Sequence, residues 1–474
     1  MSNNYQLGFS TLEQEISLER LPTQGQIPLC LRGSLFRNGP AKFEVGKEKY
    51  RHWFDGLAML HKFTFNEGQV SYINRFLQSE TYCKTLKTGK ICVAEFATTP
   101  SRPFWQNISS MLSSDLSDNA NINITQIADR FFAITATPYP VEFDPNTLKT
   151  LGKFDYKDNL PCSMTTGHPY NDFARQELVN FTTHFSRIST YNFYRIPFGQ
   201  MKRSLIASIP VNEPAYIHSF ALTENYIILP ESPLLTNPLE LISEQLRGKP
   251  FIDSLSWQPE RGAKFLVLRR EDGEFVRSYE TDAFFALNQI NAFENKDEII
   301  LDIVAYNRSI LDEYYLDFLK GSGRFKLSNS ELRRYSISLN KSRLECEVIS
   351  DQIIEFPRIN PLYYQSPNYR FVYAISRRQD RPYDFFNQLI KIDILRQTTK
   401  IWFEENCYPS EPVFVATPKA QGEDEGVIFS IVLDVKKGNS FLLILDSCSF
   451  SEIGRAEIPH HIPFGTHGQY FAVD

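Results

Sequence analysis

Short runs of β-branched and aromatic residues, separated by turn-forming residues, recur along almost the whole chain. Examples are residues 130–156, 263–281, 370–380 and 426–446. The runs are broken by DPNT at 144–147, EDGE at 271–274 and KKGN at 436–439, which is the pattern of β-hairpins. This pattern predicts an all-β fold and constrains the chain more than any other feature. Aromatic residues, 14% of the total, fit it because their rings pack well on pleated sheets.

The length of 474 residues would allow two or three ordinary domains. No Ser/Gly/Pro-rich linker or block of charge divides the chain, so we expect one domain over residues 1–474. A β-propeller is an all-β architecture that reaches this size as one domain. No clean period of 40 to 50 residues is present, so irregular blades with insertions are expected rather than WD40-type repeats.

Charge and cysteine usage exclude several classes of protein. Basic and acidic residues are mixed along the chain and the net charge is −6, so no nucleic-acid partner is expected. The seven scattered cysteines indicate reduced thiols rather than a disulfide framework. The N-terminus has no signal-peptide pattern, and no run of about 18 apolar residues could span a bilayer. We therefore expect a cytoplasmic protein that at most associates with a membrane surface.

Two segments interrupt the strand pattern, residues 103–116 and 233–246. The apolar residues of 103–116 lie at helical spacing, and those of 233–246 lie close together in the sequence. One interpretation is a pair of helices that pack their apolar faces on the sheets. The other is a paired apolar patch that contacts a membrane surface and collects a lipid-like substrate.

The eight histidines form neither an HExxH motif nor a zinc-type spacing with cysteines. An isolated histidine is more often a hydrogen-bonded structural residue than a metal ligand. In a propeller, however, the inner strands of successive blades meet at one axis. His168, His218 and His467, which lie far apart in the sequence, could therefore form one central metal site.

Ordered sequence blocks make the chain resemble the carotenoid cleavage oxygenase family. They include GSLFRNGP at 33–40, HWFDGLAMLHKF at 52–63, IHSFALTENYIIL at 217–229, EFPRIN at 355–360 and IPFGTHG at 462–468. The resemblance implies a seven-bladed β-propeller with an axial metal site and a helical and loop cap that forms an apolar tunnel. It also implies Fe(II) held by four histidines, dioxygen as co-substrate, and oxidative cleavage of a conjugated double bond into two carbonyl products.

The resemblance assigns three ligands directly, to His168, His218 and His467. The fourth ligand position is Asn288, whose amide could direct Oδ1 at iron while its NH₂ group donates to Glu355. Glu355 and Glu411 match two of the three glutamates that orient ligand histidines in this family. The position of the third glutamate is Ala136. The sequence thus predicts an iron site that has lost one imidazole and one supporting carboxylate.

Three functions follow from these residues. The first is an Fe(II)-dependent dioxygenase acting on a hydrophobic polyene, a carotenoid or an apocarotenoid. The second is an impaired homologue that binds an apocarotenoid or retinoid without cleaving it, which Asn288 and Ala136 favour. The third is isomerisation or cleavage of stilbene-like phenols, as relatives of the same fold perform.

Overall fold

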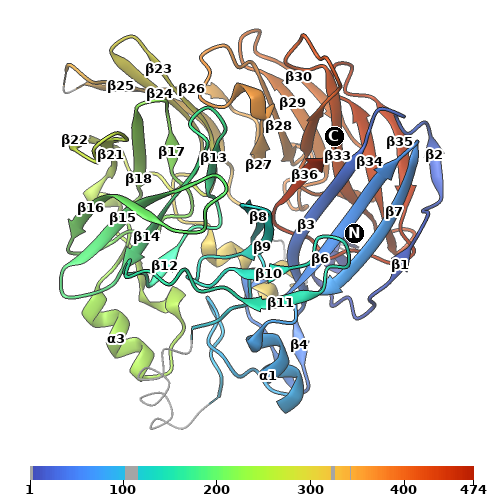
Figure 1. The fold of residues 1–474 in the computed structure, drawn as a ribbon, viewed down its shortest axis with the longest axis horizontal. Helices are drawn as coiled ribbons and strands as arrows, with labels where there is room; N and C mark the ends of the chain where they lie inside the picture. The colour runs from blue at the N-terminus through green and yellow to red at the C-terminus, as the bar shows by residue number, and fades with distance from the viewer. Residues whose placement is uncertain (1–3, 102–115, 322–325, 342, 474) are drawn as a thin grey trace.

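Seven antiparallel sheets surround a common axis in the computed structural model, which describes residues 4–101, 116–321, 326–341 and 343–473 (Figure 1). Each sheet has four to six strands, and each is one blade of a propeller. The prediction of an all-β, seven-bladed propeller is therefore confirmed.

The first four blades follow the chain from residue 17 to residue 281. Blade 1 contains β1 (Ser17–Leu18), β7 (Gln69–Phe76), β6 (Leu57–Asn66), β3 (Gly33–Lys42) and β36 (Gly468–Ala472). Blade 2 contains β8 (Asn123–Ile127), β9 (Arg130–Ile134), β10 (Val141–Phe143) and β11 (Thr150–Lys153). Blade 3 contains β12 (Met164–Thr165), β13 (Tyr170–Asp172), β14 (Glu177–His184), β15 (Ser189–Pro197) and β16 (Ser204–Val211). Blade 4 contains β17 (Ala221–Leu222), β18 (Tyr226–Glu231), β21 (Ala263–Arg269) and β22 (Phe275–Thr281).

The last three blades complete the ring. Blade 5 contains β23 (Gln289–Asn295), β24 (Glu298–Ala305), β25 (Glu331–Ser338) and β26 (Leu344–Ser350). Blade 6 contains β27 (Ile354–Arg358), β28 (Phe371–Ser376), β29 (Gln388–Asp393) and β30 (Thr398–Trp402). Blade 7 contains β31 (Cys407–Pro409), β32 (Val413–Ala416), β33 (Gly426–Asp434), β34 (Asn439–Asp446), β35 (Glu452–Glu457) and β2 (Thr23–Gly25).

The predicted turns form the hairpins within the blades. In DPNT, between β10 and β11, the Asp144 carboxylate accepts hydrogen bonds from the backbone N–H groups of Asn146 and Thr147. The turns of EDGE and KKGN contain Gly273 and Gly438, with φ of +75° and +72°. Glycine adopts this left-handed conformation without a steric penalty, so these turns are fixed by local sequence.

The two ends of the chain close the ring. The C-terminal strand β36 pairs with β3 in blade 1, with Arg37 opposite Gly468. The N-terminal strand β2 pairs with β35 in blade 7, with Gln24 opposite Arg455. Because each end supplies a strand to the blade built mainly by the other end, blades 1 and 7 are held side by side.

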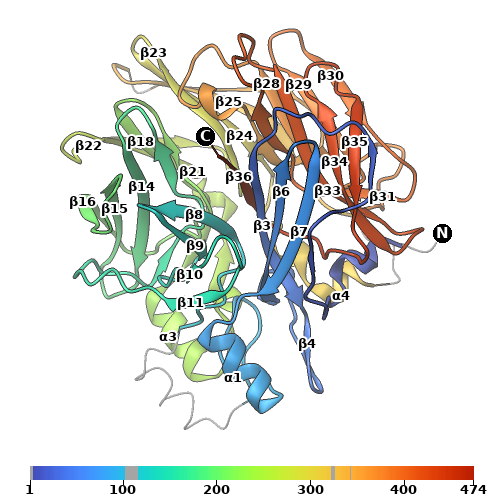
Figure 2. The same cartoon turned by 45° about the vertical axis from the view of Figure 1, so that its right-hand side comes forward.

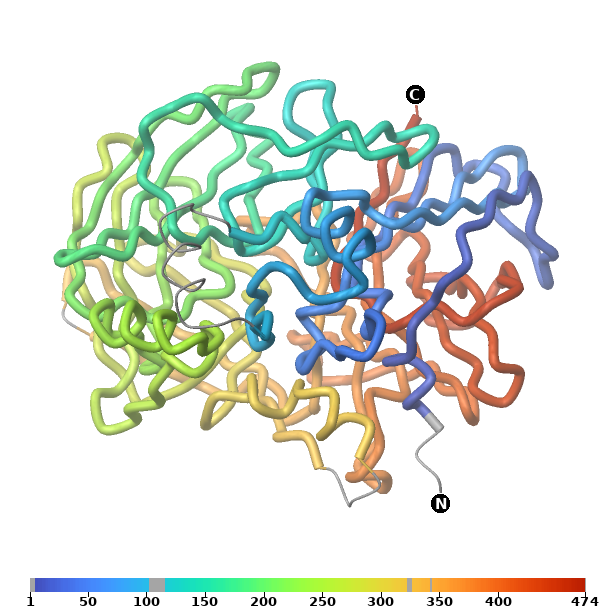
Figure 3. The backbone as a smooth tube through the Cα atoms, turned by 90° about the horizontal axis from the view of Figure 1, so that it is seen from below, coloured from blue at the N-terminus to red at the C-terminus, as the bar shows by residue number. Residues whose placement is uncertain are grey.

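Two further short sheets and a few helices lie outside the blades. The sheets are β4 (Glu44–Val45) with β5 (Glu48–Lys49), and β19 (Leu234–Thr236) with β20 (Leu255–Trp257). The α-helices in the described residues are α1 (Glu80–Thr88), α3 (Pro238–Leu246) and α4 (Leu316–Leu319). Helices α1 and α3 lie at the same edge of the molecule (Figures 1 and 2) and face the viewer when it is seen from below (Figure 3).

The expectation of one helix over residues 233–246 is partly wrong. Residues 234–236 form strand β19, and helix α3 begins only at Pro238. The Asn237 side chain caps the helix by accepting from the N–H groups of Leu239 and Glu240, and proline is favoured in the first turn. Nearly all of the other segment, residues 103–116, lies outside the described residues. No helix in the described ranges has the length and apolar character needed to cross a bilayer.

Candidate metal centre

The predicted ligand residues lie where the innermost strands begin. His467 directly precedes β36, Asn288 directly precedes β23, His218 lies just before β17, and His168 lies between β12 and β13. Neighbouring inner strands contact one another, among them β17 with β23, β23 with β27, and β36 with β8. The ring of blades therefore gathers at the axis residues that are as much as 299 positions apart, from His168 to His467.

The structure brings His168, His218 and His467 together. One ring nitrogen of each lies within 4.8 Å of the others, and the Nε2 atoms of His168 and His218 are 2.9 Å apart. Two nitrogens bound at right angles about 2.1 Å from one ion would be about 3.0 Å apart. The donor set thus fits a single transition-metal ion of the kind that imidazole prefers.

Burial keeps these imidazoles in the form that binds a metal. Burial, followed by repulsion from His467, lowers the pKa of His218 to about 3. Burial, followed by repulsion from His467 and His218, lowers the pKa of His168 well below its usual range. The pKa of His467 is also lowered by burial, although Glu411 opposes that shift. Neutral imidazoles have a lone pair available for a metal at neutral pH.

Glu411 anchors His467 from behind. Its Oε1 lies 2.7 Å from Nδ1 of His467 and accepts a hydrogen bond of 2.8 Å from Nε of Arg358. Its Oε2 accepts from Arg37 and from the backbone N–H of Gly468. Burial by itself would raise the pKa of Glu411, but the two guanidiniums and His467 outweigh it and hold that pKa well below its usual range. Glu411 is therefore an ionised carboxylate that fixes the ring orientation of His467.

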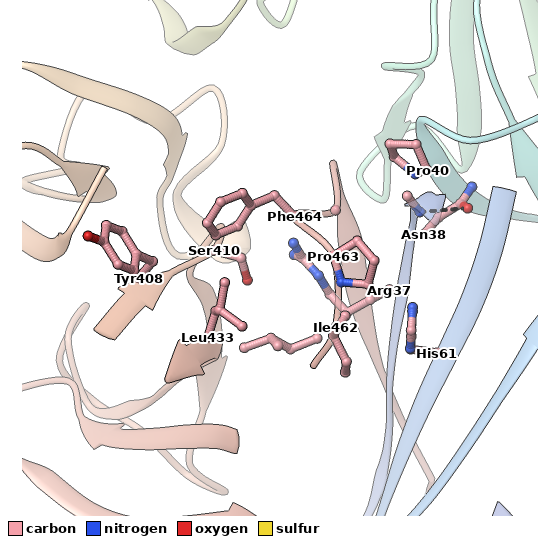
Figure 4. A pocket seen from close by; sticks show the side chains of 13 residues that line it. Arg37, Asn38, Pro40, His61, Tyr408, Ser410, Leu433, Ile462, Pro463 and Phe464 are labelled. Atoms are coloured by element: carbon pink, nitrogen blue, oxygen red, sulfur yellow. Dashed lines mark hydrogen bonds between the residues drawn. The ribbon is translucent and has the colours of Figure 1, made fainter. Parts of the chain in front are cut away.

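Arg37 and the cavity beside it connect blade 1 to blade 7. Arg37 is 3% exposed and lines a cavity that also includes His61, Ser410 and Phe464 (Figure 4). Arg37 and His61 come from β3 and β6 of blade 1, whereas Ser410 follows β31 of blade 7. The ion pair of Arg37 with Glu411 thus crosses the closing point of the propeller, next to the candidate metal centre.

Asn288 has the hydrogen bond that its proposed role requires. Its Nδ2 donates to Oε2 of Glu355 over 2.8 Å, and the planar amide then places Oδ1 on the other side of Cγ. The hydroxyl of Tyr306 donates to the other oxygen of Glu355. Burial raises the pKa of Glu355, although these hydrogen bonds oppose it. Unlike Glu411, Glu355 accepts hydrogen bonds from neutral donors. These donors bring no positive charge that would offset a charge on its carboxylate.

Ala136 cannot support a histidine, because its side chain is a methyl group. Its backbone oxygen accepts from the N–H of Thr165. Nδ1 of His218 lies 3.4 Å from the hydroxyl of Tyr216. His218 is therefore paired with a phenol, whereas His467 is paired with a carboxylate.

A cavity adjoins the histidines and is lined mainly by apolar and aromatic side chains. His218, His467 and Asn288 form one part of its wall. The rest includes Trp53, Phe54, Ile122, Leu287, Tyr314 and Phe356. Such a lining suits an apolar ligand that is held close to a few polar groups.

Two of the remaining histidines, His52 and His61, have structural partners. Nε2 of His52 is 2.9 Å from the carbonyl of Leu311, and Nδ1 of His61 is 2.8 Å from the hydroxyl of Tyr72. Burial lowers the pKa of His52 to about 4 and of His61 to about 3. Both are therefore neutral residues that connect neighbouring segments.

Sequence reasoning assigned no role to three residues of this site: Arg37, Arg358 and Tyr216. Arg37 and Arg358 lie in the blocks RNGP and EFPRIN, but their shared contact with Glu411 arises only when distant blades meet. Tyr216 could have been found, because residues two apart in an extended segment project on the same side. That spacing directs Tyr216 toward His218.

Known proteins resemble this chain over nearly its whole length. Residues 9–472 match the family described as RPE65, retinal pigment epithelial membrane protein. The chain is 32% identical to carotenoid-cleaving dioxygenase, mitochondrial, of Mustela putorius furo, over 98% of this chain and 96% of that protein. It is 33% identical to β,β-carotene 15,15′-dioxygenase of Gallus gallus, over 94% of each chain.

Solved structures have the same fold. Cobalt-substituted Synechocystis ACO superimposes with a TM-score of 0.88 at 25% identity, covering 100% of both chains. An ACO/RPE65 chimera superimposes with a TM-score of 0.89 at 26% identity, covering 99% of this chain and 98% of that chain. The likeness therefore includes every segment that supplies a residue to the centre.

Proposed function

Because this chain belongs to the RPE65 and carotenoid cleavage oxygenase family, we propose that it is an Fe(II)-dependent dioxygenase. Its substrate is a carotenoid or apocarotenoid, and the reaction converts one conjugated double bond and dioxygen into two carbonyl groups. The observation that carries the proposal is the convergence of His168, His218 and His467 beside an aromatic-lined cavity. The match over residues 9–472 also supports a single domain over the whole chain.

His168, His218 and His467 would hold the metal, with Asn288 as the fourth donor. When bound, Fe(II) supplies the dioxygen chemistry that side chains lack. His168 and His218 contribute neutral imidazoles, and Glu411 fixes the ring of His467. Asn288 is held by Glu355, so its Oδ1 is available as an oxygen donor weaker than imidazole.

The cavity positions the substrate. Trp53, Phe54 and Phe356 supply apolar surface next to His218 and His467, which favours a polyene over a polar ligand. Aromatic walls also exclude water from the reacting bond. The depth to which a polyene enters would select the double bond that reaches the centre.

Oxygen-isotope labelling tests this function. The protein is loaded with Fe(II) without air and then given an apocarotenal and ¹⁸O₂. Cleavage predicts two shorter carbonyl products, each with one labelled oxygen when read before exchange with water. His168→Ala should give neither product, because it removes a ligand and leaves the cavity walls in place. Binding of the apocarotenal without products would favour the alternative of a carrier, which Asn288 and Ala136 support.

Helix α3 supports a peripheral membrane contact. Leu239 and Ile242 are 74% and 47% exposed, while Leu241 of the same helix is buried. The exposed pair would allow the protein to rest on a lipid surface that holds its substrate.

Co-sedimentation with phosphatidylcholine vesicles should fall several-fold in a Leu239→Glu/Ile242→Glu variant, because two charged groups replace the apolar pair. A matched control is Leu395→Glu/Ile401→Glu, whose residues are 68% and 50% exposed at blade 6. The control should sediment like the unmodified protein. Equal losses in both variants, or no sedimentation of the unmodified protein, would contradict a contact through α3.

A further inference from the structure

We infer that Tyr216 is the positioning residue of His218. The inference deepens the proposed function, since it concerns the same centre, but it is tested by metal binding rather than by cleavage. Its basis is the 3.4 Å contact between the Tyr216 hydroxyl and Nδ1 of His218.

The contact involves Nδ1 of His218, the ring nitrogen that does not face His168. Nε2 of His218 faces His168 at 2.9 Å, so Nδ1 is the nitrogen that points away from the centre. A histidine that binds a metal through Nε2 carries its proton on Nδ1, and the partner of that N–H decides the tautomer and the ring orientation. The phenol oxygen of Tyr216 is therefore placed to accept the Nδ1–H hydrogen bond.

Tyr216 is itself held in place before any metal binds. Its side chain is buried, 8% exposed, and its backbone N–H donates to the carbonyl of Leu234 over 2.8 Å. Its ring stacks on Phe285 at 6.5 Å and packs against Phe96 at 5.7 Å. A side chain fixed in this way loses little further freedom when it orients a ligand.

A phenol and a carboxylate differ in charge, and this difference defines what Tyr216 can do. A phenol hydroxyl carries no charge at neutral pH. A neutral acceptor forms a weaker hydrogen bond than an ionised one. Tyr216 therefore orients His218 but adds no negative charge near a bound cation, unlike Glu411 behind His467.

The test uses Co(II), whose absorption spectrum reports the coordination of the bound ion. Tyr216→Phe should lower the affinity for Co(II) by about 10-fold or more, the scale measured when an outer partner of a ligand histidine is removed. In metal-free protein labelled with ¹⁵N-histidine, the same change should shift His218 away from the Nδ1–H tautomer.

Tyr191→Phe is the matched control. Tyr191 is also fully buried, and its hydroxyl accepts from the N–H of Ala215 over 2.7 Å and donates to Glu231. Tyr191→Phe therefore removes a buried phenol hydroxyl beside the segment that contains Tyr216, without touching a histidine. The affinity of this variant for Co(II) should be unchanged. An unchanged affinity in Tyr216→Phe, or an equal loss in Tyr191→Phe, would overturn the inference. A protein that binds Co(II) as expected but cleaves no polyene would contradict the proposed function and leave this inference standing.

Discussion

Glu411→Gln is expected to lower the free energy of unfolding by about 3–5 kcal/mol, the cost of removing one partner from a buried ion pair. The carboxylate lies between Arg37 and Arg358 and also pairs with His467. Glutamine keeps the shape of the side chain but leaves the two guanidiniums without a compensating charge. The same change should weaken Fe(II) binding by about 10–100-fold, because His467 loses its supporting carboxylate. Chemical denaturation and anaerobic Fe(II) titration measure the two effects.

Glu355→Gln is the matched control for this prediction. Glu355 is also fully buried, but its side chain accepts from Tyr306, Asn288 and the backbone of Phe356, all of them neutral. Glu355→Gln should lower the free energy of unfolding by about 1 kcal/mol, the scale of one hydrogen bond. Equal costs in the two variants would contradict the view that Glu411 stabilises the fold by neutralising buried cations.

Asn288→His is expected to raise the affinity for Fe(II) by about 10-fold or more and the cleavage rate with it. Imidazole is a better donor to iron than a neutral amide oxygen, and Glu355 already lies 2.8 Å from the Asn288 amide to accept the far N–H of the new ring. Asn288 lines the cavity beside the histidines, so the larger side chain would extend into that cavity. Iron content and apocarotenal cleavage, measured on the same preparation, check both parts.

Gln289→His provides the comparison. It adds the same imidazole one position along, where the alternation of an extended strand directs the side chain elsewhere, so it should change neither the iron content nor the cleavage rate.

Combining Asn288→His with Ala136→Glu should do more than either change, since a ligand and its supporting group act as a unit. Higher iron content without faster cleavage would favour a carrier. An unmodified protein that already cleaves at about 1 s⁻¹ or faster, an ordinary enzyme rate, would show that Asn288 is no handicap.

Hairpins were predictable because their signals are local. The glycines of EDGE and KKGN and the aspartate of DPNT determine their turns without reference to the rest of the chain. The absence of a clear repeat has a structural reason. Residues 232–262 of blade 4 and 306–330 of blade 5 are inserted between neighbouring strands of those blades, so blades of similar topology differ in length.

Contacts between blades could not be predicted in this way. Arg37 and Glu411 are 374 residues apart, and their pairing depends on the closure of blade 1 against blade 7. Strand β19 was missed for the same reason, because it is defined by pairing with β20 some twenty residues later. The start of α3 was readable, since Asn237 followed by Pro238 is a helix-start signal. The resemblance to a known family supplied the candidate ligands, and the structure adds the groups that orient them.

Anaerobic equilibrium dialysis against Fe(II) tests most directly whether three histidines and an asparagine hold iron. One iron per chain is expected in the unmodified protein and almost none in His168→Ala, with both proteins equally folded by circular dichroism. Iron that stays bound in His168→Ala would place it elsewhere on the chain. No iron bound to the unmodified protein above the level in His168→Ala would contradict the metal centre itself.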